Sequence, residues 1–133
     1  MMLVKTIVKP STIEGLGLFA DQDIPQGTPV WQFTPGFDAL IEPQSLAQLP
    51  QIARDQFMKY AYLSKKSGKH VLCFDDARFF NHDANPNISC AHSAYAVAEE
   101  DICLANRKIT RGQELTCNYR EFDAGPPEPF ISV

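Results

Sequence analysis

Three short segments carry the residue types that could do chemistry, and they lie far apart in the chain. They are E-G-L-G at residues 14–17, R-F-F-N-H-D-A-N-P-N at residues 78–87 and R-G-Q-E-L-T-C-N-Y at residues 111–119. Amide, imidazole and phenol side chains can orient a ligand by hydrogen bonds or move a proton. Each segment alone also fits a purely structural role: a tight turn, a buried hydrogen-bonding pair or a packed tyrosine.

In this order the segments resemble the SET domain of protein lysine methyltransferases. That family carries G-x-G, then R-F-x-N-H-S-x-x-P-N, then G-E-E-L-T-x-D-Y, and the similarity here extends from residue 13 to residue 119. The R-F-F-N-H-x-x-x-P-N string is its most specific part. The resemblance implies methyl transfer from S-adenosylmethionine to a lysine side chain of a protein or peptide. A minimal, single-domain bacterial or viral member of the family is expected.

The resemblance also implies a fold: mainly β, of small antiparallel sheets, with a C-terminal pseudoknot and a short helical insert. In the pseudoknot the C-terminal segment threads under a preceding loop and meets Asn81 and His82. Residues 1–121 would form the SET domain, with the insert at about 42–67. Residues 122–133 would form a tail that closes the lysine channel.

The family's motifs assign roles to individual residues here. Tyr119 would be catalytic, orienting the reacting groups and stabilising charge, because a phenol with a pKa of about 10 is mostly protonated at neutral pH. The cofactor would also contact residues of all three segments: Glu14, Gly15, Leu16, Gly17, Arg78, Asn81, His82 and Tyr119. The two glycines would let the backbone approach the cofactor. Arg78 would bind the cofactor's carboxylate or form an ion pair with Asp75 or Asp76, and both readings stay open.

A second set of residues is expected to shape the lysine channel: Thr34, Cys90, Cys117, Phe122 and Phe130. Thr34 replaces a channel tyrosine of the family, which puts substrate fit in doubt. Cys90 and Cys117 are small where some members carry larger side chains, so we expect transfer beyond a single methyl group. Phe122 and Phe130 would be channel walls, although Phe130 could equally be a packing residue.

Hydrophobic and turn patterns predict short strands around one helical region. Strands are expected near residues 3–8, 18–20, 28–33, 70–74, 79–80, 95–98, 102–105 and 114–117. Residues 42–67 read as helical, divided by Pro43 and Pro50 into a short and a longer helix. Met58, Ala61 and Tyr62 share a helical face.

Composition narrows the class of protein. With 133 residues, 44% hydrophobic and 21% charged, the chain reads as one soluble domain. A net charge of −4 argues against nucleic-acid binding and mildly favours a lysine-rich partner. Neither a signal peptide nor a membrane span is visible. We therefore expect a cytoplasmic protein with four reduced, buried cysteines.

Three other possibilities remain at this level. A SET-fold module could bind cofactor or peptide without transfer, and Thr34 favours that alternative. A metal could bind His82, Cys90 and His92, although their spacing is loose and no C-x-x-C pair occurs. A homodimer could also form through an exposed strand edge.

Overall fold

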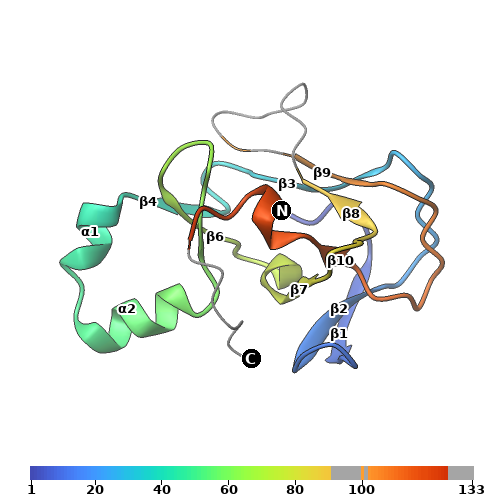
Figure 1. Ribbon diagram of the computed structural model, residues 1–133, viewed down its shortest axis with the longest axis horizontal. Coiled ribbons are helices and arrows are strands. Elements are labelled where there is room, and N and C mark those ends of the chain that lie inside the picture. Colours follow the sequence, from blue (N-terminus) through green and yellow to red (C-terminus); the bar gives the residue numbers. More distant parts are fainter. Residues whose placement is uncertain (91–99, 101, 126–133) are drawn as a thin grey trace.

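The computed structural model describes residues 1–90, 100 and 102–125, which build three small sheets with two helices at one end (Figure 1). One sheet is the antiparallel hairpin of β1 (Thr6–Pro10) and β2 (Leu16–Ala20). Another contains β4 (Ala39–Ile41), β6 (His70–Leu72) and β5 (Tyr62–Leu63), in that order. The expected mainly β architecture of small sheets is confirmed.

The central sheet brings together segments that are distant in the sequence. Its order is β3 (Pro29–Gln32), β9 (Ile102–Ala105), β8 (Ile88–Ser89), β10 (Thr116–Cys117) and β7 (Asn81–His82). Strand β10 lies between β7 and β8, which follow one another in the chain. The C-terminal segment thus passes between the two strands that flank residues 83–87, as the family's threading requires.

This central sheet also corrects one expectation, because it is not wholly antiparallel. Strand β10 pairs in parallel with both β7 and β8. Parallel neighbours need a long crossover connection rather than a hairpin. The chain between β8 and β10, which includes β9, supplies that connection, and short-range patterns carry no signal for it.

The helical region is shorter than expected. Helix α1 (Pro43–Ala47) and helix α2 (Gln51–Met58) start at or next to the two prolines, as expected from the preference of proline for the first helical turn. Helix α2 has no buried residue. The chain beyond it turns into β5, whose backbone groups pair with β6. The prediction of helix as far as residue 67 is therefore wrong after Met58.

The strand expected at residues 79–80 is also wrong. The 3-10 helix η1 (Asp76–Phe79) occupies this stretch, and the Asp75 side chain caps it by accepting a hydrogen bond from the Ala77 N–H. Aspartate is a preferred N-cap, so this start signal was present in the sequence. The strand expected at 95–98 lies outside the described residues. The turn expected before β3 is present, with Gly27 at φ 85°.

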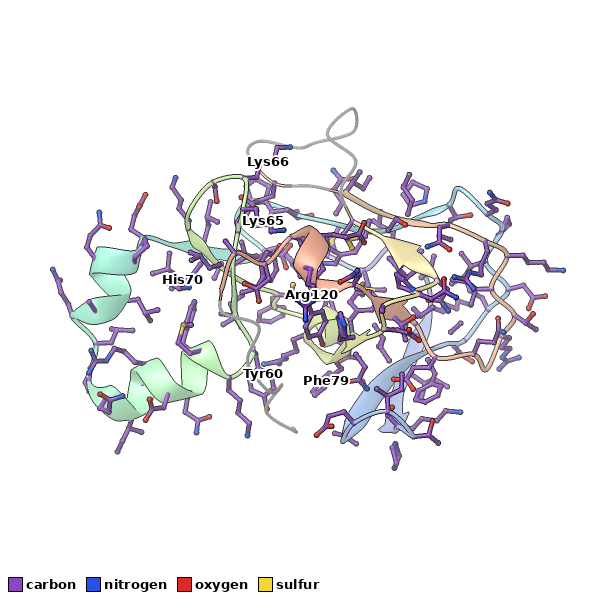
Figure 2. All side chains as sticks on the ribbon, in the orientation of Figure 1. Tyr60, Lys65, Lys66, His70, Phe79 and Arg120 are labelled. Atoms are coloured by element: carbon purple, nitrogen blue, oxygen red, sulfur yellow. A yellow bond between two sulfur atoms is a disulfide. The ribbon has the colours of Figure 1, made fainter. Side chains whose placement is uncertain are left out.

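The core lies between the central sheet and the β1–β2 hairpin. Its fully buried side chains include Leu18, Ile24, Val30, Ile88, Ile109 and Leu115. The segment after β10 continues through the 3-10 helix η3 (Tyr119–Glu121) and docks on β5, where Ala124 N–H donates to the Leu63 carbonyl. Lys65 Nζ donates to the carbonyl of Arg120 in the same contact (Figure 2). No helix among the described residues has the length and apolar character needed to span a membrane.

Candidate active site

One cavity of about 260 Å³ lies where the three sheets meet. Its walls come from three groups of residues. The first joins the β1–β2 turn to η1 and includes Glu14, Leu16, Tyr60, Arg78, Phe79 and Asn81. The second lies on or next to the central sheet and includes Trp31, Cys90, Glu100, Cys103 and Cys117. The third includes Tyr62, Ser64, Tyr119, Phe122 and Asp123. Met58, Ala61 and Tyr62, expected to share a face, all line it.

Asn81 ties the first group together. Its Nδ2 lies within hydrogen-bond distance of the carbonyl oxygens of Glu14 and Leu16, at 3.0 and 3.2 Å, and of Glu114 Oε2, at 2.8 Å. The Glu114 carboxylate also accepts from the Ser11 hydroxyl. Asn81 therefore fixes the β1–β2 turn against the C-terminal motif. The sequence reasoning assigned no role to Glu114 or Ser11, although Glu114 stands inside the third motif.

The predicted cofactor glycines have different surroundings from those expected. Gly15 adopts φ 42°, a conformation that favours glycine, and the turn it forms exposes the Glu14 and Leu16 carbonyls to Asn81. At Gly17 an added Cβ would meet the Glu114 carboxylate. Neither glycine lines the cavity, whereas Glu14 and Leu16 do. The close approach that requires Gly17 is to Glu114, so its predicted role of making room for the cofactor is corrected.

Tyr119 connects the second motif to the third. Its backbone N–H donates to His82 Nδ1 at 3.1 Å, and its hydroxyl donates to the backbone carbonyl of Phe80. Its ring packs edge-on against His82, with centroids 5.3 Å apart. Burial, followed by the nearby Cys117 and the carboxylates of Asp123 and Glu114, raises the pKa of the phenol well above its ordinary value of 10. Tyr119 is therefore a protonated hydrogen-bond donor at neutral pH, held in place by His82.

The cysteines correct a further expectation. Cys90 and Cys103 form a disulfide between the strand pair β8–β9, where their Cα atoms are 4.0 Å apart. The antiparallel register places Ser89 opposite Leu104, so the next residues face each other. Cys73 and Cys117 are free and buried, as expected. Cys117 Sγ lies 3.7 Å from Cys90 Sγ, and burial raises the pKa of the Cys117 thiol well above its usual value.

Two of the three ligands suggested for a metal, Cys90 and His82, are engaged in other contacts. Cys90 is oxidised in the disulfide, and His82 Nδ1 accepts the Tyr119 N–H. His92 lies outside the described residues. Within the described part of the chain no group of three or more histidine, cysteine or acidic side chains is arranged to hold a metal ion.

Arg78 lines the cavity among aromatic rings. Its guanidinium carbon lies 5.2 Å from the Tyr60 ring centroid and 5.8 Å from that of Phe79, and the centroids of these two rings are 6.2 Å apart. Figure 2 labels Tyr60 and Phe79. The structure shows no ion pair between Arg78 and any described acidic residue. Asp75 instead accepts from the backbone N–H groups of Met2 and Ala77. Of the two roles left open by the sequence, the ion pair is therefore excluded.

The predicted channel residues divide into three outcomes. Cys90, Cys117 and Phe122 line the cavity, and the Phe122 ring packs 4.9 Å from Tyr62. Thr34 does not line it, because its hydroxyl donates to the Gln32 carbonyl. Its predicted place in the channel is wrong, and Trp31 of the same segment lines the cavity instead. Phe130 lies outside the described residues.

Residues 15–120 match the family profile of the SET domain, which is most of the chain. The chain belongs to the SET domain family. Solved structures share its fold. A candidate histone methyltransferase of Plasmodium falciparum superposes with a TM-score of 0.61 at 19% identity, covering 89% of this chain and 95% of that one. Polycomb Repressive Complex 2 of Chaetomium thermophilum, in a humanized mutant bound to the inhibitor GSK126, superposes with a TM-score of 0.67 at 25% identity, covering 97% and 16%.

Curated relatives of this SET domain are much longer proteins. Human histone-lysine N-methyltransferase 2D is 30% identical over 119 residues, which is 85% of this chain but 2% of that protein. The H3 lysine-36 specific histone-lysine N-methyltransferase of Mycosarcoma maydis is 33% identical, over 80% of this chain and 11% of that protein. The SET domain described here thus spans only a small part of each relative's length.

Proposed function

We propose that this SET domain transfers a methyl group from S-adenosylmethionine to the side-chain amine of a lysine in another protein. The observation that carries the proposal is the meeting of Asn81, Phe80 and Tyr119 in one cavity. The Tyr119 hydroxyl reaches the Phe80 carbonyl only because β10 is inserted beside β7. Two sequence motifs that resemble those of methyltransferases thereby form one continuous surface.

The cavity suits the proposed cofactor chemically. Arg78 offers a guanidinium that no described acidic residue neutralises, and guanidinium groups bind carboxylates well. The rings of Tyr60 and Phe79 offer flat apolar surface beside it. Asn81 holds the Glu14–Leu16 backbone at the cavity wall. Bound there, S-adenosylmethionine would supply an activated methyl group, so no metal is needed for this chemistry.

The remaining walls suit a lysine side chain. Tyr62, Phe122 and Tyr119 form an aromatic surface, with ring centroids 4.9 Å apart for the first two and 5.9 Å for the last two. A lysine with an ordinary pKa of about 10.4 is only about 0.04% neutral at pH 7, a deficit of about 4.6 kcal/mol. Apolar walls reduce that deficit because desolvation disfavours the ammonium form. Tyr119 stays protonated, so it orients the amine and does not act as a base.

The proposed substrate is a lysine-rich protein, with histones as the first class to examine. Two of the relatives described above are named histone-lysine methyltransferases. The net charge of −4 also favours a basic partner. The bacterial or viral origin, the cytoplasmic location and a homodimer stay predictions, which source determination, cell fractionation and sedimentation of the purified chain would test.

The alternative of a binding module without transfer loses the feature that favoured it. The sequence places Thr34 where the family has a channel tyrosine, but its hydroxyl donates to the Gln32 carbonyl and it does not line the cavity. Nothing at Thr34 therefore argues against turnover. The alternative remains testable, because a module would bind cofactor and release no methylated product.

A transfer assay tests the proposal directly. Purified protein is incubated with cofactor labelled in its methyl group and with core histones as the acceptor. We expect label on lysine, at a rate that falls sharply in Tyr119→Phe, while Glu42→Gln, a surface carboxylate outside the cavity, serves as the matched control. Cofactor binding without label transfer to histones, or to the proteins of a whole-cell extract, would support the binding module instead.

The lid proposed for the tail needs its own experiment. Residues 122–125 are docked on β5 and Phe122 lines the cavity, which supports a wall in this region. Phe130 is not described, so its part stays a prediction. Removal of residues 126–133 should lower turnover and leave the melting temperature unchanged. Unchanged turnover would refute a lid beyond residue 125.

A further inference from the structure

Glu100 is a buried carboxylate at the wall of the same cavity. Only 2% of its surface is exposed, and its Oε2 atom has no hydrogen-bond partner. It forms no ion pair with any described basic residue. An unpaired carboxylate is among the least favourable groups to bury, since it has given up its hydration without compensation. Such a group, lining a cavity, points to a ligand that provides the missing donor.

Three other charged side chains of the cavity wall have contacts of their own. The two cations, Lys59 and Arg78, lie over the Tyr60 ring. Asp123 Oδ1 accepts from the backbone N–H groups of Leu63 and Gly125. Trp31 and Cys103, which pair across β3 and β9, line the cavity as well as Glu100. Both cations of the cavity wall are thus held at Tyr60, and neither forms an ion pair with Glu100.

We propose that Glu100 is the binding site for the ammonium group of the substrate side chain, which it recognises by charge and by a hydrogen bond to Oε2. The inference rests on the proposed function for the identity of the ligand, a primary alkylammonium. A primary ammonium carries three donors and no acceptor, which complements a bare carboxylate oxygen. Apolar walls exclude water and strengthen this interaction relative to one in solvent. Glu100 then selects an amine over a neutral group of equal size as the lysine enters in its ammonium form, which predominates at pH 7. The proton leaves before transfer, because only the neutral amine attacks the methyl group.

Trp31 provides a direct report on this site. It is the single tryptophan of the chain, and it lines the cavity together with Glu100. A small ligand that reaches Glu100 should therefore change the intrinsic fluorescence without any turnover. The probe is n-butylammonium chloride, which reproduces the end of a lysine side chain. Butan-1-ol is the neutral probe of matched length, and sodium chloride controls for ionic strength.

The expected result is a saturable change with n-butylammonium at concentrations where butan-1-ol and sodium chloride give none. Glu100→Gln keeps the shape of the side chain and removes its charge. It should lower the affinity for n-butylammonium by about 10- to 100-fold. Glu100→Asp keeps the charge and should retain a preference for the cation over the alcohol. Glu42→Gln, outside the cavity, should match the wild type.

Two results would overturn the inference. One is an equal change of Trp31 fluorescence with n-butylammonium and with butan-1-ol in the wild-type protein. This measurement does not depend on the folding of any variant. The other is unchanged n-butylammonium binding in Glu100→Gln. Because neither measurement needs methyl transfer, a protein that binds the cation through Glu100 but transfers no label would refute the proposed function alone. In an active protein, Glu100→Gln should raise KM for a lysine peptide more than it lowers kcat.

Discussion

The hydroxyl of Tyr119 donates a hydrogen bond to the backbone carbonyl of Phe80, a residue 39 positions earlier in the chain. The backbone N–H of the same tyrosine donates a hydrogen bond to His82 Nδ1. These contacts, to Phe80 and His82 of the second motif, leave the Tyr119 ring little freedom. The site therefore depends on a tyrosine whose position is fixed by the strand pairing around it.

Tyr119→Phe should lower the rate of methyl transfer by about 10²- to 10³-fold, the usual effect of removing one preorganised hydrogen-bond donor. Affinity for the cofactor should change little, because the ring and the His82 contact remain. Initial rates with labelled cofactor and equilibrium binding by calorimetry separate the two effects. A parallel loss of cofactor binding would show that the hydroxyl holds the cofactor rather than the reacting groups.

Stability should fall as the solution becomes alkaline. Burial, followed by the Asp38 charge, raises the pKa of Cys73 to about 12 from 9.0, and burial raises that of Cys117 as well. Above pH 9 the unfolded chain loses these protons while the folded chain keeps them. The stabilisation is complete below pH 9 and is lost as the pH rises toward 12, by about 1.4 kcal/mol per pH unit for each thiol.

Urea unfolding at pH 8 to 11 measures this dependence. Cys73→Ser removes one of the two thiols and should make the decline less steep. A free energy of unfolding that stays constant from pH 9 to pH 11 would contradict the burial of both thiols.

Asn81 offers a pair of substitutions with different outcomes. Asn81→Ala removes the donor to Glu14, Leu16 and Glu114, and should lower the free energy of unfolding by about 2–3 kcal/mol. Asn81→Asp places an acceptor where three acceptors already converge, so it should lower the free energy of unfolding at pH 7 more than Asn81→Ala does. Chemical denaturation at pH 7 and pH 5 tests both. Protonation at low pH should recover part of the loss in the aspartate variant only.

The Cys90–Cys103 disulfide should contribute measurably to stability. It closes a loop with a sequence separation of 13, for which chain entropy predicts about 3 kcal/mol. Thermal unfolding with and without a reductant measures the contribution, and mass spectrometry establishes the bond. Cys103→Ser should unfold at the same temperature in both conditions, whereas Cys73→Ser should keep the difference. A wild-type melting temperature that is the same with and without the reductant would contradict the presence of a stabilising disulfide.

The product should carry more than one methyl group. Cys117 lies in the cavity wall with Cys90 only 3.7 Å away between sulfur atoms, so no large side chain narrows this wall. Mass spectrometry after exhaustive reaction should show dimethyl- or trimethyl-lysine. Cys117→Leu, checked for folding by circular dichroism, should shift the product toward monomethyl-lysine. A wild-type reaction that stops at one methyl group would refute the inference.

Local patterns were sufficient for much of the fold. The positions of β9, the turn at Gly27 and the division of the helical region at Pro43 and Pro50 all follow from residues close together in the chain. Prolines, glycines and alternating apolar residues act through the backbone conformation of their own neighbourhood. These local signals gave the wrong secondary structure where pairing with a strand distant in the sequence decided it. Tyr62 and Leu63 became a strand because β6 offers them hydrogen bonds.

The site divides in the same way. The three motifs marked Asn81, His82 and Tyr119 by residue type and order alone, and the structure brings those motifs together. Only the tertiary structure decided that Gly17 makes room for Glu114, that Thr34 lies outside the cavity, and that Cys90 pairs with Cys103. Each of these outcomes depends on which atoms of another strand lie opposite. A one-residue change in register would reverse them while leaving every local pattern intact.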